Sequence, residues 1–187
     1  MTILVILIVA VLVVAVIVGA MQMQRRRSAR LQDRFGPEYQ QVVADVGSRR
    51  AGESELAERE ERREALDIRP LGADARDRYS TAWQDVQARF VDSPNDAIGD
   101  ADRLVHQVMR DRGYPMDDFD QRAADISVDH AGVVADYRAA HDISERNDAG
   151  QASTEDLRLA MVHYRALFQD LLVVDTGATT LREARHG

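Results

Sequence analysis

A long uncharged segment near the start of the chain constrains its folding more than any other feature. From residue 3 to residue 21 there are 19 consecutive positions without a charge, almost all of them Ile, Leu, Val or Ala. At a rise of about 1.5 Å per residue, a helix of this length spans the hydrocarbon core of a bilayer, which is about 30 Å thick. The sequence therefore predicts an N-terminal transmembrane helix with the lipid bilayer as its partner.

A cluster of basic residues follows this segment. Arg25, Arg26, Arg27 and Arg30 lie on its C-terminal side, whereas no basic side chain precedes it. Because basic flanks of a span are retained in the cytoplasm, the rest of the chain is predicted to lie there, in a single-pass membrane protein. These four arginines are the predicted membrane-interface residues. They could also bind particular anionic lipids, but a topology signal is the more common role of such a cluster.

A cleaved secretory signal is the alternative interpretation of the same segment. Val18, Gly19 and Ala20 resemble a signal-peptidase site, and cleavage there would release a secreted helical protein. A secretory signal, however, has a basic N-terminal region and an apolar core of about 7 to 15 residues. Because this segment is longer and its arginines lie on the opposite side, the sequence favours an uncleaved anchor.

The composition excludes several classes of function. The chain has no cysteine and all 24 of its basic residues are arginine, which excludes disulfides, thiolate metal sites, lysine-dependent phosphate loops and Schiff-base lysines. After Arg34, 19 arginines face 31 acidic residues, so this part carries a net charge of −12 with histidine neutral. Because nucleic acid repels such a domain, nucleic-acid binding is not expected.

Helical periodicity runs through most of the chain after the anchor. Apolar residues recur at spacings of three and four, and no stretch alternates as a strand does. We expect an all-α fold in which the transmembrane helix is followed by a soluble bundle of about five or six helices. The predicted divisions are 1–35 as the anchor and basic segment, 36–71 as a charged amphipathic stalk, 72–174 as the bundle and 175–187 as a flexible tail. Within the stalk, residues 48–66 are predicted to form a solvated helix or a weak coiled coil.

Several residues mark the ends of the predicted helices. Ser93 is placed to start a helix that Gly113 ends, since glycine readily takes the left-handed conformation beyond a helix. Asp129 is a candidate cap for a later helix. Ser153 and Asp156 have the spacing of a capping box, which predicts the start of the last helix.

The segment 145–156 has the length and the central glycine of a calcium-binding loop. Its ligand positions one, three, five and twelve are Glu145, Asn147, Ala149 and Asp156. Ala149 has no side-chain oxygen, and Asp156 is shorter than the glutamate that such loops place last. A turn between two helices is therefore expected here.

The remaining chemistry-bearing residues form no recognised motif. None of the five histidines has metal-ligand spacing, and there is no Gly-rich phosphate loop or nucleophile elbow. We therefore predict no cofactor, no metal and no catalytic residue. The favoured function is a non-enzymatic, membrane-tethered module that contacts a protein partner. The alternative is an enzyme or small-ligand binder with a pocket between helices, with the following candidate residues: His106, His141, His163, Tyr137 and Tyr164.

Several phrases spread over the chain resemble, as a set, a family of uncharacterised bacterial single-pass membrane proteins. The resemblance covers nearly the whole chain and implies a bacterial origin, an N-terminal anchor and a helical soluble domain. It implies no activity, cofactor or catalytic residue. The phrases are Arg34-Phe-Gly-Pro-Glu-Tyr39, Ala65-Leu-Asp-Ile-Arg-Pro-Leu71, Gln87-Ala-Arg-Phe-Val-Asp92, Arg112-Gly-Tyr-Pro115, Ser153-Thr-Glu-Asp-Leu157 and Met161-Val-His-Tyr-Arg-Ala-Leu167.

Overall fold

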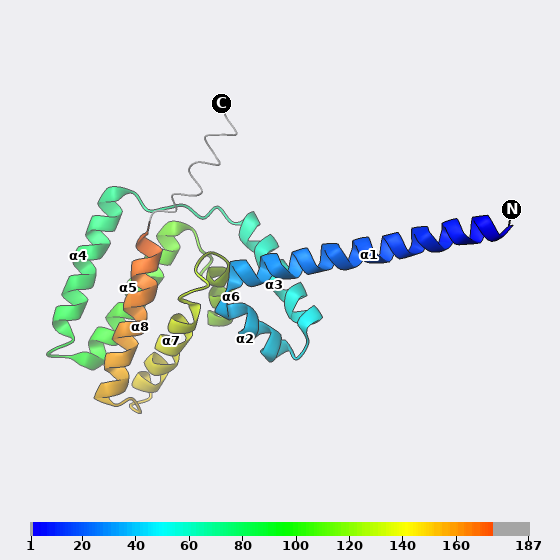
Figure 1. The fold of residues 1–187 in the computed structure, drawn as a ribbon. Helices are drawn as coiled ribbons and strands as arrows, with labels where there is room; N and C mark the ends of the chain where they lie inside the picture. Colours follow the sequence, from blue (N-terminus) through cyan, green and yellow to red (C-terminus); the bar gives the residue numbers. More distant parts are fainter. Residues whose placement is uncertain (1, 174–187) are drawn as a thin grey trace. The chain divides into compact units, whose positions relative to one another are not determined.

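The structure is a computed structural model that describes residues 2–173, without the side chains of residues 2–11 and 13. Within this range every regular element is a helix, which confirms the all-α prediction (Figure 1). The predicted flexible tail, 175–187, lies outside the described residues. The helices are α1 (Thr2–Phe35), α2 (Pro37–Val46), α3 (Arg49–Ala65), α4 (Ala73–Arg89), α5 (Pro94–Arg112), α6 (Phe119–Asp129), α7 (Val134–Asp148) and α8 (Thr154–Leu172).

The number of helices differs from the prediction. Seven helices follow α1 in the described residues, making eight in all, whereas five or six were predicted after the anchor. The extra helix arises in the predicted stalk. There Gly47 takes the left-handed conformation, with φ of 77°, and its N–H bonds back to the carbonyls of Val43 and Ala44. This cap ends α2, so the stalk consists of two helices, α2 and α3.

The predicted transmembrane helix is not supported by the described part of the chain. Over these residues, none of the helices combines the length and the apolar character that crossing a membrane requires. Of the predicted span, residues 3–11 and 13 lie outside the residues whose side chains are described.

The contacts divide the chain into two units, with the boundary inside α3. The N-terminal unit runs to Ala57 and the C-terminal unit begins at Glu58. In the N-terminal unit, α2 and α3 approach so closely that a Cβ on Gly52 would lie 2.9 Å from Val43 Cα. The stalk is therefore not simply solvated, and Leu56 of α3 is fully buried. The buried apolar residues of this unit are Leu31, Phe35, Tyr39, Val42 and Leu56.

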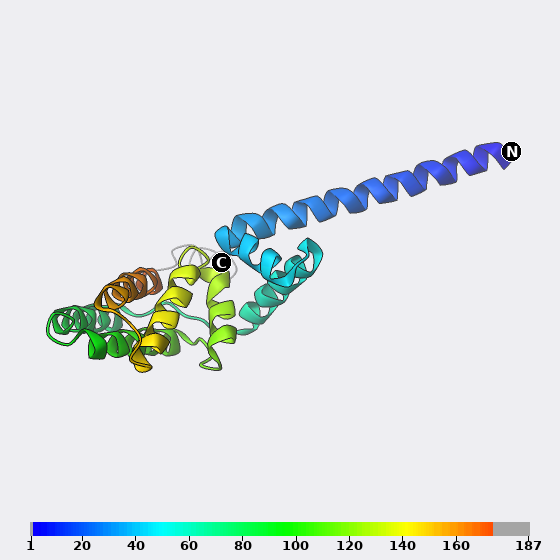
Figure 2. The ribbon, with the colours of Figure 1, turned by 90° about the horizontal axis from the view of Figure 1, so that it is seen from below.

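The C-terminal unit is a helical bundle with one continuous apolar core. Helices α4, α5, α7 and α8 run side by side, with α8 packed against both α5 and α7, and α6 packs on α7 (Figures 1 and 2). Trp83 of α4 stacks on Phe168 of α8 with ring centroids 4.7 Å apart. Such aromatic contacts and aliphatic burial supply the main driving force for folding. The fully buried apolar side chains include Ile98, Val105, Met109, Tyr137, Tyr164 and Leu167.

The predicted helix ends at Gly113 and Ser153 are confirmed. Ser153 and Asp156 form the reciprocal capping box of α8. Gly113 follows α5 with φ of 97°, in the left-handed region. A Cβ at this position would lie 2.6 Å from the backbone oxygen of Asp67, because the segment between α3 and α4 passes close by. Only glycine therefore fits here without displacing the backbone.

We expect Gly113→Ala to lower the free energy of unfolding by about 3 kcal/mol, because it combines left-handed strain with a backbone clash. The measurement is urea unfolding of the full-length chain in mild detergent. The fluorescence of Trp83, the single tryptophan, reports the unfolding. Gly132→Ala is the control, since nothing lies within 4 Å of a Cβ there, and it should change stability by less than about 0.5 kcal/mol. Equal effects of the two substitutions would contradict the assignment.

Candidate functional site

The predicted membrane-interface residues lie on the part of α1 that follows the apolar segment. Arg25, Arg26, Arg27 and Arg30 are all exposed. Just before them, the described apolar side chains of α1 are uncovered, including Val16 with 71% of its surface exposed. A row of exposed aliphatic side chains on one helix is unusual for a surface in water, and it marks α1 as a candidate interaction surface.

Most of the predicted ligand-binding candidates meet in one hydrogen-bonded network inside the C-terminal unit. Tyr137 of α7 lies at its centre, with its hydroxyl 2.7 Å from Arg122 Nε and 3.2 Å from His106 Nε2. His106 Nδ1 lies 3.2 Å from Asp102 Oδ2, and Tyr164 of α8 donates to Asp102 Oδ1 at 2.8 Å. The network thus joins α5, α6, α7 and α8.

The chemistry of the donors fixes the direction of these bonds. The Arg122 guanidinium only donates, so the Tyr137 oxygen accepts from it. The Tyr137 proton is then available for His106 Nε2, which leaves the Nδ1–H of the imidazole facing the Asp102 carboxylate. His106 is therefore neutral in this arrangement, with its proton on Nδ1.

The pKa directions agree with this assignment. Burial lowers the pKa of His106 below its usual value, although Asp102 opposes the shift. Burial likewise raises the pKa of Tyr137 to about 12, against the lowering effect of Arg122. The pKa of Tyr164 is also raised, first by burial and then by Asp102. Near neutral pH the imidazole thus stays uncharged and both phenols keep their protons.

The other two candidates are placed differently. His141 stacks on Phe119 with ring centroids 3.7 Å apart, and Phe119 also contacts Tyr137, so His141 borders the network. His163 takes no part in it and instead lies 2.6 Å from Asp136 Oδ1 through its Nδ1. A carboxylate, an imidazole and a phenol in series can relay protons. Here their polar atoms are engaged with one another, so the network braces the four helices.

A second buried network centres on Arg112, which the sequence did not single out. Its side chain is only 1% exposed and donates to the carbonyl of Leu171 at 2.9 Å. Its Nη1 also lies 3.2 Å from His130 Nε2, and His130 Nδ1 lies 2.5 Å from Asp170 Oδ2. The helical spacing of α5 could have indicated that Arg112 is buried. Arg112 lies four residues after Val108 and so continues the buried face of this helix.

Asp129 does not cap the following helix, contrary to the prediction. It is the last residue of α6, and Val133 occupies the position before α7. Its carboxylate pairs with Arg63 and accepts a hydrogen bond from the Tyr114 hydroxyl at 3.2 Å. Burial, reinforced by Asp129, raises the pKa of Tyr114. Asp129 therefore connects α3 to the bundle within the C-terminal unit.

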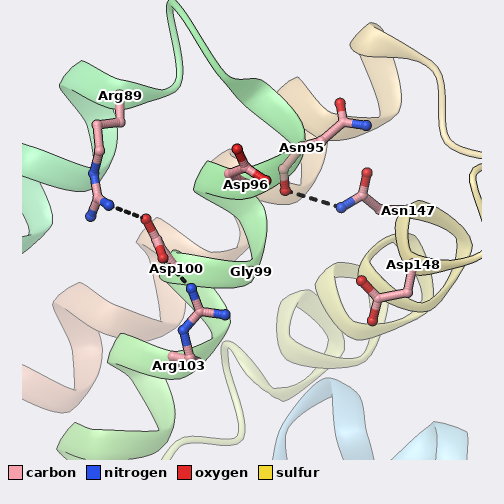
Figure 3. Close-up of a pocket in the computed structure, with 8 residues that line it drawn as sticks. All are labelled: Arg89, Asn95, Asp96, Gly99, Asp100, Arg103, Asn147 and Asp148. Carbon is pink, nitrogen blue, oxygen red and sulfur yellow. Dashed lines mark hydrogen bonds and ion pairs between the residues drawn. The ribbon is translucent and has the colours of Figure 1, made fainter.

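An open hollow of about 480 Å³ lies where α4 ends, α5 begins and α7 ends (Figure 3). Arg89 and Arg103 both pair with Asp100, and Asn147 Nδ2 donates to the carbonyl of Asn95 at 3.1 Å. The two guanidinium groups share this one carboxylate and are themselves largely exposed, and ion pairs in such surroundings contribute little energy. Both arginines that line the hollow are thus engaged with Asp100.

The segment 145–156, which has the length of a calcium-binding loop, is a helix-capping turn. Glu145 and Asn147 belong to the last turns of α7, and Gly150 has φ of 67° in the turn that follows. The Asp156 carboxylate accepts from the N–H and hydroxyl of Ser153 at 2.9 and 2.8 Å. Across the described residues, no three His or acidic side chains form a group that could hold a metal ion.

We expect Tyr137→Phe to lower the free energy of unfolding by about 2 kcal/mol, because it leaves the buried Nε of Arg122 without its acceptor. The matched control is Tyr79→Phe, since the Tyr79 hydroxyl bonds to Asp111 at 2.7 Å on the exposed surface. That change should cost less than about 1 kcal/mol. Urea unfolding measures both, and a smaller loss for Tyr137→Phe than for Tyr79→Phe would rule out the bracing role.

His106 gives the stability a defined dependence on pH. Because its folded pKa lies below the ordinary value of 6.5, the unfolded chain binds more protons between these two values. The contribution of His106 is therefore complete above pH 6.5 and is lost as the pH falls toward the folded pKa. The stability advantage of the unchanged protein over His106→Asn should shrink between about pH 7.5 and about pH 5.5. An advantage that grows on acidification would refute the neutral assignment.

Comparison with known proteins gives no further assignment. No protein-family model, curated protein or solved structure matches this chain. The resemblance to membrane-anchored bacterial proteins therefore stays a prediction, and the proposals below depend on the chain's own residues.

Proposed function

We propose that this protein is a membrane-tethered, non-enzymatic helical module that contacts a protein partner near the cytoplasmic face of the membrane. The observation that carries the proposal is the uncovered apolar side of α1. Leu12, Val16 and Met23 expose 60%, 71% and 74% of their surface, and 19 uncharged residues end just before the arginine cluster. Burying such side chains in lipid gains about 25 cal/mol for each Å² of apolar surface.

The charge distribution supports the proposed orientation. Arg25, Arg26 and Arg27 follow the apolar segment, as expected for a flank retained in the cytoplasm. The chain after Arg34 carries a net charge of −12 with histidine neutral. An anionic membrane surface repels such a domain, so the fixed arginines and the mainly acidic remainder favour a tethered domain that extends into the aqueous phase.

A groove between α4 and α8 supports the proposed protein contact. Its volume is about 200 Å³, and Phe90, Met161 and Val162 provide its apolar lining. Val91, which follows Phe90 in the chain, is 83% exposed, and Arg165 is an exposed cation in the lining. Apolar anchors with a basic rim suit an amphipathic segment that carries both apolar and acidic side chains.

The polar interior supports a non-enzymatic role. Tyr137, Tyr164 and Arg112 are fully buried, and their polar groups are bonded to other side chains and carbonyls of the bundle. A catalytic acid or base must reach its substrate directly or through one water. These groups instead hold helices together, so the outer surfaces are the better candidates for function.

Fractionation of cells that make the full-length chain tests the anchor. We expect the protein to pellet with membranes, to resist carbonate extraction and to be released by detergent. Leu12→Arg with Val16→Arg should move it to the soluble fraction, because each arginine costs about 2.5 to 3.5 kcal/mol in the middle of a span. Val162→Arg, an exposed change in the bundle, is the control and should stay with membranes.

Two outcomes would contradict the anchor: recovery of the unchanged protein in the soluble fraction, or a mature N-terminus at Met21 in the extracellular fraction.

Crosslinking in the same membranes tests the protein partner. A photo-crosslinking amino acid is placed at position 162 and, as control, at the exposed Thr81. We expect an adduct from position 162 alone, and its loss when Arg165→Glu is added. Absence of an adduct under several growth conditions would remove the partner from the proposal.

A further inference from the structure

A second hollow lies entirely within the N-terminal unit, between α1 and the first turns of α3. Its volume is about 580 Å³. Two of its lining residues are apolar and lie at or just beyond the end of the apolar segment, and the other five are polar or charged. The lining residues are Ala20, Met23, Gln24 and Arg27 from α1, and Arg50, Glu53 and Ser54 from α3.

The α1 side of the hollow changes from apolar to basic along a single helical stripe. Ala20, Met23, Gln24 and Arg27 are spaced by three, four and seven residues, so they share one face of the helix. Seven residues of helix rise by about 10 Å. The headgroup layer on each side of a bilayer is about 5 to 7 Å thick, so this stripe reaches from the acyl chains through the headgroups.

Two guanidinium groups face this hollow from different helices. Within the described residues, the side chains of Arg27 and Arg50 make no hydrogen bond and no ion pair, and both are exposed. Arg30 and Arg34, further along α1, already interact with other groups of the chain. The hollow therefore holds two cations with unused donors.

Glu53, the one acidic residue in the lining, does not neutralise the charges of these two guanidinium groups. Glu53 is buried, and its carboxylate accepts from the Tyr39 hydroxyl at 2.8 Å and from Arg49 Nε at 2.9 Å. Burial raises the Glu53 pKa, but hydrogen bonds from Ser28, Arg49 and Tyr39 outweigh it and hold the pKa below its usual value. Glu53 is thus ionised and paired with Arg49, which leaves the hollow with the charges of Arg27 and Arg50.

The start of α3 adds to this positive potential. The helix begins at Arg49, and its first turn contains no acidic residue. The N-terminal end of a helix carries a partial positive charge, which favours an anion nearby. An anionic group in the hollow would therefore interact with two guanidinium groups and with the helix end.

We propose that this hollow binds the headgroup of one anionic phospholipid. Arg27 and Arg50 donate to the phosphate, Gln24 bonds to the polar part of the headgroup, and Ala20 and Met23 contact the first carbons of an acyl chain. A lipid fits better than free phosphate, because Ala20 and Met23 connect the lining to the apolar segment of α1 and would gain nothing from an inorganic ion. The inference rests on the proposed membrane location of α1.

The test uses the full-length protein purified in detergent micelles and isothermal titration calorimetry. The probes are dihexanoyl-phosphatidylglycerol, dihexanoyl-phosphatidylcholine and inorganic phosphate. We expect saturable binding of one phosphatidylglycerol, at least about ten-fold tighter than either of the other probes. Paired substitution to Arg27→Gln and Arg50→Gln should weaken this binding about ten-fold or more.

The matched control is Arg25→Gln with Arg26→Gln, which removes the same charge from exposed positions outside the lining. This variant should keep its affinity within about two-fold. Equal losses in the two paired variants would show that net charge, and not the hollow, determines binding, and would overturn the inference. Phosphatidylcholine or inorganic phosphate binding as tightly as phosphatidylglycerol would overturn it as well.

Membrane fractionation separates this inference from the function on which it rests. Both paired variants retain the whole apolar segment, so both should pellet with membranes and show the helical circular dichroism of the unchanged protein. If the unchanged protein pellets with membranes but does not discriminate between the lipids, only the headgroup inference fails. If the unchanged protein is soluble, the proposed anchor fails, whatever the calorimetry gives.

Discussion

The arrangement of the C-terminal unit depends on the burial of one guanidinium group. Arg112 is almost fully removed from solvent, so each of its donors needs an acceptor from the protein. It reaches the carbonyl of Leu171 at the end of α8 and the ring of His130 after α6, while its own carbonyl accepts from the N–H of Arg69 at 2.8 Å. Removing a partner from such a group costs about 3 to 5 kcal/mol, so these contacts favour a single arrangement of the helix ends.

The hydrogen-bonded network around Tyr137 also restricts how the helices pack, because its buried polar groups need partners on particular helices. Arg122, His106 and Asp102 each have an oriented partner, and burial keeps His106 neutral. Apolar packing drives the helices together, whereas these polar bonds select which faces meet. Because the polar groups of this network bond to one another, the function of the bundle is better sought on its outer surface.

In the apolar segment of helix α1, unlike in the bundle, the described apolar side chains are not covered by the protein. Side chains of this segment, such as Val16, are exposed, and the basic side chain of Arg27, which lines the hollow, follows them. In the proposed arrangement, lipid would cover these apolar side chains and its headgroup would bind the Arg27 side chain. The anchor and the headgroup hollow therefore belong to one proposal. The hollow needs α3 as well as α1, since Arg50 comes from the folded N-terminal unit.

The sequence by itself determined the all-α class and several helix ends, because capping at Ser153 and the left-handed turn at Gly113 depend on residues close in the chain. It also named His106, Tyr137 and Tyr164 as candidates. It could not distinguish Asp102 or Arg122 among 32 acids and 24 arginines. Only the tertiary structure decided the packing of Leu56, the pairing of Asp129 with Arg63, and the partners of Arg112, the farthest of which is 59 positions away. Contacts at such separations depend on how the helices pack, and helical periodicity alone does not specify which faces meet.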